Sequence, residues 1–250
     1  MNQALLRLDR VSKSFSLNSE SRAVIQDINL EVRAGEILCL VGRSGSGKST
    51  ILNLCSGLLS PDSGQIERSG QVAYAPQQDL LLPWRTVLDN AVLALEVRGR
   101  KDQCTLKAAF STLRALGMTE AQALFPEQLS GGMRQRTSLA RALIQDGEIM
   151  LFDEPLSALD FDARLRLGKE LRDLIRRSGK AALFVTHNIE EAISIGDRVM
   201  MLGGRPAGIL FESRIEIDES LRDPVSVRKS PVFQALFEKL WGLLAEENTR

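Results

Sequence analysis

A glycine-rich segment, GRSGSGKST at residues 42–50, constrains the fold of this chain more than any other stretch. An apolar run at 37–41 precedes it, and a helix that should end near Gly57 follows it. The order strand, loop, helix is therefore expected here. The segment fits the phosphate-loop pattern G-x-x-x-x-G-K-[ST] at four positions, Gly42, Gly47, Lys48 and Ser49.

The chemistry of this loop suits the phosphates of a nucleotide. Glycines let the backbone turn several N–H groups inward, and the following helix adds its positive dipole end. Lys48 brings a full charge to the outer phosphates, and the Ser49 hydroxyl can hold Mg²⁺. Ser44, Gly45 and Thr50 complete the expected contacts. A plain strand-to-helix turn accounts for the glycines but not for Lys-Ser at that offset.

Composition narrows the class of protein. The 250 residues suit one large domain, or one domain with a smaller lobe, and 44% apolar residues can build a core. Lys+Arg and Asp+Glu each count 32, and this balance speaks against a nucleic-acid partner. We expect no membrane span and no signal peptide, since no apolar run approaches 18 residues. Three widely spaced cysteines without metal spacing indicate reduced thiols. A cytosolic nucleotide-binding protein is the expected class.

The regions on either side of the loop differ in periodicity. Residues 4–32 alternate as a β hairpin, with the polar stretch 16–24 expected as its connection. Phe15, in this hairpin, is either a core aromatic or a face on which adenine stacks. Residues 71–77 should form a strand. The apolar loop after it is either folded under the domain or a docking surface, and it contains Leu80, Leu81, Leu82, Pro83 and Trp84.

The second half of the chain changes from helical to alternating structure. Residues 86–146 carry helical periodicity and are expected to be an inserted helical lobe. From residue 149 onward, strands and helices alternate, which predicts a parallel sheet covered on both faces. The last helix, near 231–244, should pack back on the domain rather than bind a partner. Its apolar face carries Phe233, Leu236, Phe237, Leu240 and Leu244.

Polar side chains at strand ends complete a candidate catalytic site. Asp153 follows a buried strand and is expected to hold Mg²⁺, with a solvated strand-end acid as the alternative. Glu154 is the candidate that polarises the attacking water. His187, the single histidine, is either structural or a donor near the γ-phosphate. Gln77 also ends a strand and can contact both Mg²⁺ and water.

A second glycine-rich turn, LSGGM at residues 129–133, opens another helix. Such a helix start can bind an anion, whereas the alternative is that Ser130 simply caps the helix. One nucleotide needs one phosphate loop. A second anion site far along the chain therefore indicates that it serves a nucleotide held by another copy of the chain.

Six motifs in one order give the chain a specific resemblance: GRSGSGKST, Gln77, LSGGM, IMLFDEP, SALD and His187. Over roughly residues 5–220 it resembles the ATPase subunits of ATP-binding cassette (ABC) transporters. The resemblance implies an α/β P-loop NTPase fold with a mainly parallel sheet, an N-terminal antiparallel β subdomain and a helical subdomain at about 86–146. The ATPase domain should span 4–220, followed by a C-terminal helical tail at 221–250.

The same resemblance implies a head-to-tail dimer with two ATP molecules and Mg²⁺ at its interface. Each ATP lies between the phosphate loop of one chain and Ser130, Gly131 and Gly132 of the other. Glu154 resembles the catalytic base and His187 the switch histidine. Residues 157–160 resemble the loop that communicates across the dimer. Phe15 falls where the family places its adenine-stacking aromatic.

Two residues depart from the family pattern: Met133 replaces the usual glutamine and Phe15 the common tyrosine. LLPWRTVLDN together with LSGGMRQR is most similar to the nitrate/sulfonate/taurine importer branch. This implies uptake of a small anionic solute at the cytoplasmic face of the inner membrane. The partners are a permease that docks near Leu82, Pro83 and Trp84 and, indirectly, a solute-binding protein.

Other functions remain open at this stage. The chain could serve a different importer branch, or be a soluble cassette ATPase acting on nucleic acid or in translation. The latter usually have two cassettes or a long coiled coil, which this chain lacks. A binding-only cassette is a third alternative, against which Lys48, Asp153, Glu154 and His187 speak.

Overall fold

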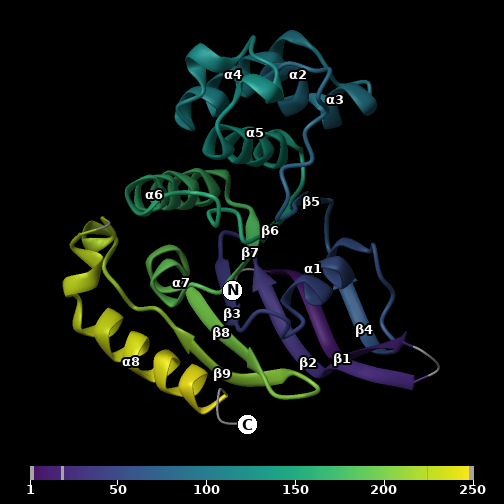
Figure 1. The fold of residues 1–250 in the computed structure, drawn as a ribbon, viewed down its shortest axis with the longest axis vertical. Coiled ribbons are helices and arrows are strands. Elements are labelled where there is room, and N and C mark those ends of the chain that lie inside the picture. The colour runs from purple at the N-terminus through teal and green to yellow at the C-terminus, as the bar shows by residue number, and fades with distance from the viewer. Residues whose placement is uncertain (1–2, 18–19, 224, 248–250) are drawn as a thin grey trace.

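The computed structural model describes residues 3–17, 20–223 and 225–247, which form two β-sheets and several layers of helices (Figure 1). The smaller sheet is antiparallel with strand order β2-β1-β4. Its strands are β1 (Ala4–Leu17), β2 (Glu20–Arg33) and β4 (Ser63–Arg68).

The larger sheet has the strand order β5-β6-β7-β3-β8-β9. The first five of these strands are parallel, and β9 runs antiparallel to β8 at the edge. The strands are β3 (Ile37–Gly42), β5 (Val72–Ala75), β6 (Ile149–Asp153), β7 (Ala181–Thr186), β8 (Arg198–Gly203) and β9 (Gly208–Arg214). The expected mainly parallel sheet is confirmed.

The central strands are buried on both faces because their alternate side chains enter two different hydrophobic clusters. In β3, Leu38 and Leu40 pack toward the antiparallel sheet and α1 (Lys48–Ser56). Cys39 and Val41 pack on the opposite face, against a cluster that includes α6 (Phe161–Ser178), α7 (Ile189–Ile195) and α8 (Pro231–Glu246). Continuous apolar strands are the pattern expected of a parallel sheet covered on both sides.

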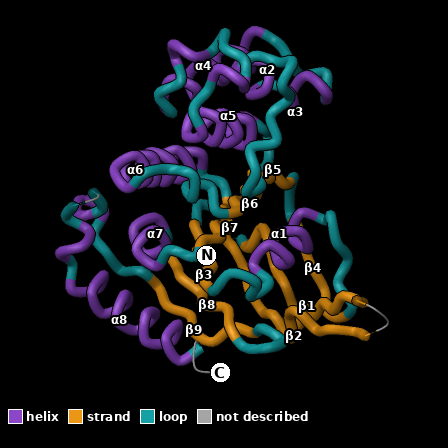
Figure 2. Tube along the Cα trace, in the orientation of Figure 1, coloured by secondary structure: helices purple, strands orange, loops and turns teal. Residues whose placement is uncertain are grey.

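A helical layer lies beyond one end of the larger sheet (Figures 1 and 2). It consists of α2 (Val87–Ala91), α3 (Leu93–Val97), α4 (Gln103–Ala115) and α5 (Gly131–Ile144), with short 3₁₀ turns at Thr119–Ala121 and Pro126–Gln128. Side chains cap several of these helices: Thr86 accepts from Asp89 N, and Asp102 forms a reciprocal capping box with Thr105. Helices thus occupy the region where the periodicity predicted them.

The antiparallel sheet differs from the sequence expectation at two places. The polar stretch 16–24 is largely strand, since β1 extends to Leu17 and β2 begins at Glu20; residues 18–19 lie outside the described part. In addition, no strand is expected from the sequence after α1, yet β4 lies there around Gly64 and pairs with β1. Both segments are polar because they lie at the solvent-exposed side of a small sheet, where the apolar alternation is weak.

The last helix packs on the domain as expected. Pro231 starts α8, where its fixed φ suits the first turn, and Phe233, Leu236 and Leu240 are buried. Trp241 is 62% exposed. Within the described ranges, no helix is long and apolar enough to cross a membrane. The assignment of a domain at 4–220 and a tail at 221–250 stays a prediction, and residues 224 and 248–250 of that tail lie outside the described part.

Candidate active site

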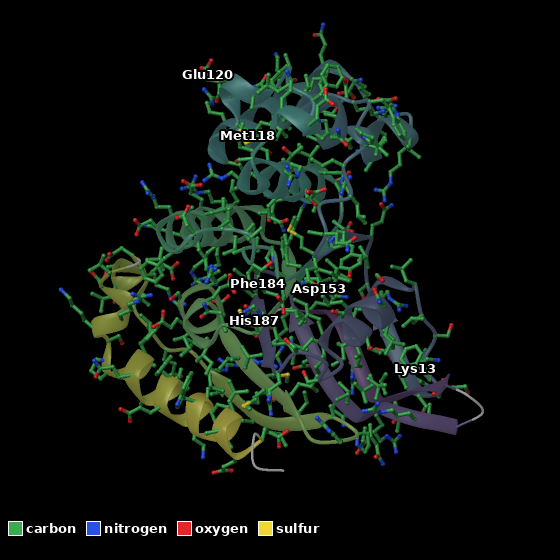
Figure 3. The ribbon with its side chains drawn as sticks, in the orientation of Figure 1. Lys13, Met118, Glu120, Asp153, Phe184 and His187 are labelled. Atoms are coloured by element: carbon green, nitrogen blue, oxygen red, sulfur yellow. The ribbon has the colours of Figure 1, made fainter. Side chains whose placement is uncertain are left out.

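The candidate site is assembled at the carboxyl ends of four neighbouring parallel strands. In the sheet order β5-β6-β7-β3, these ends lead into Gln77, the pair Asp153 and Glu154, His187 and the phosphate loop. Asp153 and His187 accordingly lie near each other at one edge of the sheet (Figure 3). Parallel strands place their carboxyl ends along one edge, where α/β proteins commonly bind ligands.

Two glycines give the phosphate loop its shape. Gly47 precedes α1 with φ +88°, and a Cβ there would lie 2.6 Å from Ile25 Cγ2. A Cβ on Gly42 would lie 2.7 Å from Leu202 O. Side chains at these positions would push the loop away from β2 and β8. The loop can therefore follow this path only with glycine at both positions.

Lys48 is held inside the loop. Its side chain is almost fully buried, and Nζ donates to Gly42 O at 2.9 Å and to Arg43 O at 2.7 Å. Burial lowers the pKa of Lys48, against the opposing effect of Glu154 and Asp153. Nearby, the buried Ser46 Oγ has no hydrogen-bond partner among the described residues. The loop thus has a cation and a hydroxyl available for an anion to bind.

A hollow of about 500 Å³ adjoins the loop, lined in part by Arg22, Ser44 and Gly45. Phe15 pairs with Arg22 across the hairpin and is 41% exposed, with Lys13 Nζ 5.8 Å from the ring centroid. Its exposure rules out the core-aromatic alternative. Contact of Phe15 with adenine stays a prediction.

The Ser49 hydroxyl donates a hydrogen bond to the Asp153 carboxylate. Asp153 is 5% exposed; burial raises its pKa, and the hydrogen bond from Ser49 opposes this rise. Tyr74 Oη lies 3.5 Å from Asp153 Oδ2. Hydroxyl and carboxylate oxygens suit Mg²⁺, which usually takes few protein ligands and completes its shell with phosphate oxygens and water. The described residues contain no group of three or more His, Cys, Asp or Glu side chains that could hold a metal ion.

Glu154 is fixed between two of the other predicted site residues. Its Oε2 lies 3.0 Å from His187 Nδ1 and accepts from Gln77 Nε2 at 3.4 Å. Its backbone has φ +46°, and its N–H donates to Val185 O at 2.9 Å. The structure therefore brings Glu154, His187 and Gln77 together beside Asp153.

Hydrogen bonds to Glu191 stabilise the turn that carries His187, and the sequence did not predict them. Thr186 Oγ1 donates to the Glu191 carboxylate and accepts from Asn188 N at 3.0 Å. Asn188 Oδ1 in turn accepts from Glu191 N at 3.1 Å, capping α7. Burial raises the pKa of Glu191 to about 7. Asn188 can be recognised in the sequence as a helix cap, whereas the burial of the Glu191 side chain depends on tertiary packing.

The second glycine-rich turn lies in the helical layer. Among the described residues, it lines neither the hollow at Ser44 and Gly45 nor a second hollow bordered by Gly42 and His187. Ser130 caps α5 and accepts from Met133 N at 3.3 Å, and both Ser130 and Gly131 are exposed. A Cβ on Gly132 would lie 2.9 Å from Leu159 Cδ2, so this turn adjoins the SALD segment. Met133 packs against the hydrophobic core, which explains an apolar residue at this position.

Residues 25–157 match the family model described as ABC transporter. The chain is 38% identical over 224 residues to the nitrate import ATP-binding protein NrtD of Synechococcus elongatus, covering 85% of this chain and 81% of that protein. It is 34% identical to the taurine import ATP-binding protein TauB of Pseudomonas aeruginosa, covering 94% of each. It is also 34% identical to the formylaminopyrimidine import ATP-binding protein ThiZ of Halalkalibacterium halodurans, covering 100% of each.

A solved structure has the same fold: the dimeric post-hydrolysis state of the ATP-binding cassette MJ0796, bound to ADP and Pi. The two match with a TM-score of 0.76 at 28% identity, over 85% of this chain and 100% of that chain. The fold and the strand-end site define a P-loop ATPase. The chain belongs to the ABC transporter family, as one of its ATP-hydrolysing cassettes.

Proposed function

We propose that this chain hydrolyses ATP with Mg²⁺ to energise uptake of a small anionic solute through a separate membrane permease. The observation that carries the proposal is the grouping of Glu154, His187 and Gln77 beside Asp153 and the phosphate loop. A nucleotide-binding protein without catalysis has no need of a carboxylate fixed in this way.

The site suggests how its residues divide the work. Lys48 exchanges its bonds to Gly42 O and Arg43 O for the β- and γ-phosphates. Ser49 and Asp153, with help from Gln77, would hold Mg²⁺, which would supply charge neutralisation on the phosphate oxygens when bound. Glu154 orients the attacking water and accepts its proton.

His187 is suited to hold the Glu154 carboxylate in place. Its side chain is 55% exposed, so that it can also reach the γ-phosphate from the edge of the sheet. The imidazole contacts Glu154 in the structure, and the γ-phosphate of a bound nucleotide would compete with Glu154 for it. We therefore assign His187 the role of a switch between the empty and the ATP-bound site.

The other half of the ATP site comes from a second copy in our proposal. Ser130 and Gly131 lie exposed at the start of α5 and Gly132 is half-buried beside them, where N–H groups and the helix dipole favour a phosphate. They are not part of the lining of the hollows of about 500 and 380 Å³ that adjoin the phosphate loop in the described part of the chain. The structural relative MJ0796 is dimeric with ADP and Pi bound. A head-to-tail dimer would place each exposed turn over the partner's phosphate loop.

The permease is proposed to dock beside the apolar loop at Leu82, Pro83 and Trp84. Trp84 is 70% exposed, and a hollow of about 440 Å³ nearby is lined in part by Leu80 and Val97. An exposed apolar patch of this kind is typical of a protein-binding surface. Such docking would hold the chain peripherally at the cytoplasmic face of the inner membrane. A solute-binding protein would act indirectly, and we expect no nucleic-acid partner.

The solute is proposed from the relatives. Two of them are named for import of nitrate and of taurine, both small anions or zwitterions with an oxyanion group, and these define our candidates together with sulfonates. The ThiZ relative is named for formylaminopyrimidine import, which keeps a different importer branch as the second candidate. Cells without this chain should lose uptake of one of these solutes.

The ATPase reaction of the purified chain tests the dimeric mechanism. Turnover per chain should rise with protein concentration and reach a plateau, because a complete site needs two copies. Glu154→Gln removes the proton acceptor but keeps the shape, and we expect at least about a 100-fold loss of turnover with ATP binding retained. Turnover per chain that stays constant from nanomolar to micromolar protein would contradict the shared site.

A further inference from the structure

The end of α8 is fastened to the phosphate loop. Arg43 Nη1 donates to the main-chain oxygen of Glu247 at 3.1 Å. The Glu247 carboxylate accepts from Gly204 N at 2.7 Å, in the turn between β8 and β9. Arg43 occupies the second position of the loop, next to Gly42. The last turn of the C-terminal helix therefore lies against the nucleotide site and not at a remote surface.

Trp241 extends an aromatic stack from the core to this region. Phe233 is buried and stacks on Phe237 with centroids 6.3 Å apart, and Phe237 stacks on Trp241 at 5.9 Å. The interplanar angles are 6° and 15°. The inner members of the stack position the outer ring, whose own side chain is nonetheless 62% exposed. A tryptophan held in one orientation while exposed is a typical protein-binding residue.

The exposed ring adjoins the catalytic groups. Trp241, Leu244 and Ala245 line a hollow of about 380 Å³ together with Gly42, Arg43, Ser44 and His187. One wall of this hollow is therefore the apolar side of α8, and the other is the phosphate loop with the switch histidine. The helical turn at Ser130 and the loop at Trp84 contribute nothing to it.

We infer that the end of α8, through Trp241 and Leu244, is an added contact surface for the second copy of this chain when the dimer closes on ATP. The inference rests on the proposed function. Ser44 and His187 border the same hollow, and the proposed dimer covers both of them with the partner. The apolar patch is continuous with that surface. Closure would remove Trp241 from water and give the dimer affinity beyond that of the ATP-mediated contacts.

The competing role for Trp241 is contact with the nucleotide of its own chain. The residues that line the two hollows argue against contact of Trp241 with this nucleotide. The hollow that adjoins Arg22, the cross-strand neighbour of Phe15, lies along Ser44, Gly45 and Ser46 and does not include Trp241. Trp241 instead shares its hollow with His187, which in the proposed function faces the γ-phosphate. An aromatic ring there has no base to stack on, whereas a protein partner offers apolar surface.

The test uses Glu154→Gln as parent, because this variant should bind ATP and stay closed. Sedimentation velocity with ATP gives the dimer dissociation constant of the parent and of the parent with Trp241→Ala added. We expect dimerisation to weaken at least about 10-fold, since buried tryptophans commonly dominate interfaces. Binding of a fluorescent ATP analogue at nanomolar protein, where the chain is monomeric, should change less than about 2-fold.

Leu58→Ala is the matched control, because Leu58 is 68% exposed and lies outside this hollow. It should leave the dimer constant unchanged. A second readout uses the fact that the chain has two tryptophans. With Trp84→Phe in the parent, Trp241 alone emits, and ATP should shift its emission to the blue and reduce its quenching by acrylamide.

The outcomes separate the inference from the proposed function. A parent that remains monomeric with ATP contradicts the proposed dimer, and the inference with it. A parent that dimerises while its Trp241→Ala derivative dimerises as tightly contradicts the inference alone. Loss of ATP binding by monomeric Trp241→Ala would assign the ring to the chain's own nucleotide site and also overturn it. If Trp241→Ala melts early, an unchanged Trp241 emission on adding ATP is the overturning result.

Discussion

Glu154 has a backbone conformation that residues other than glycine seldom adopt, with φ at +46°. Such a conformation costs about 1–3 kcal/mol, which the surrounding structure must offset. It turns the chain sharply after Asp153, so that two consecutive carboxylates serve different purposes: Asp153 lies beside Ser49, and Glu154 faces His187 and Gln77. At the scale of single residues, strain in the backbone separates the proposed metal ligand from the proposed base.

Glu191 is the buried acid behind this edge, and its ionisation should be measurable in the stability of the fold. Burial raises its pKa from 4.5 to about 7, with Arg164 and His187 opposing the rise and Glu154 adding to it. Between pH 4.5 and about 7, the carboxyl therefore stays largely protonated in the folded chain while it ionises in the unfolded one. Between these two pKa values the unfolded state loses protons first, so that stability falls as pH rises.

Between pH 5 and pH 8, the free energy of unfolding of the unmodified protein should fall by roughly 2–3 kcal/mol. Glu191→Gln should not show this loss. Urea unfolding of both proteins at the two pH values measures it, and titrating groups that do not interact with Glu191 cancel in the comparison. Parallel pH dependences for the two proteins would show that Glu191 titrates normally. At pH 8 the variant should also loosen the turn at Thr186, since an amide accepts that hydroxyl more weakly than the ionised carboxylate does.

At the scale of elements, the loop between β5 and α2 is shaped from within by one buried amide. Asn90 Oδ1 accepts from Leu82 N at 2.8 Å, and its Nδ2 donates to Leu82 O, Arg85 O and Thr86 O. Arg141 additionally donates to Asp79 O and Leu80 O. These hydrogen bonds fix the path of the loop, and Trp84 lies exposed on it.

Trp84→Glu should uncouple this surface from the permease. A charge on an exposed apolar contact must be desolvated on docking, so we expect uptake of the transported solute to fall at least about 10-fold in cells that depend on the variant. ATP binding by the purified chain should be retained, because Trp84 lies away from the phosphate loop. Phe110→Glu, on α4 and 42% exposed, is the control and should transport normally. Normal uptake with Trp84→Glu would exclude the proposed docking position.

The elements that sequence could predict are those with a strong local signal. The apolar strands β3, β6 and β7 and the capped helices follow from hydrophobic runs and helix-start residues. From these, the grouping of Glu154, His187 and Gln77 follows as well, because parallel strand ends share one edge. Strand β4 was missed because its residues are mostly exposed and polar and Gly64 resembles a turn. The roles of Asn90 and Glu191 depend on tertiary burial, which no local pattern encodes.

At the scale of the whole molecule, buried arginines tie the C-terminal region to the catalytic half. Arg222 donates to Gly196 O and Ile215 O, and Arg172 donates to Ile195 O and to Asp197 and Glu219. The segment after β9 is thereby fixed to the end of α7, and α8 continues from it to the phosphate loop. The described chain is thus one connected body, and it carries the two halves of the proposed ATP site, the phosphate loop and the start of α5, at two separate surfaces.

That separation leads to a complementation prediction. Lys48→Ala disables the phosphate loop, and Gly131→Asp places a negative charge where the partner's γ-phosphate should bind. Gly131→Asp should fold, because a Cβ there meets nothing closer than Arg134 Nη2 at 3.9 Å, and an acid in the first turn of α5 suits the helix dipole. Gly132 would be a poor choice, since its Cβ would collide with Leu159 Cδ2.

Each variant alone should be inactive, since both sites of its dimer contain the lesion. In an equal mixture, half of the dimers are mixed, and each mixed dimer joins one intact phosphate loop to one intact Ser130–Gly132 turn. ATPase activity of the mixture should therefore recover, to at most about a quarter of the unmodified protein when the two sites act independently. The ATPase activity of the premixed chains is compared with the sum of the activities of the two separate variants.

No recovery, in mixtures shown by sedimentation to contain mixed dimers, would mean that one chain carries a whole site or that one intact site cannot turn over alone. A Lys48→Ala, Gly131→Asp double variant mixed with unmodified chain distinguishes these, because its mixed dimers hold no complete shared site and stay active only if each chain is self-sufficient.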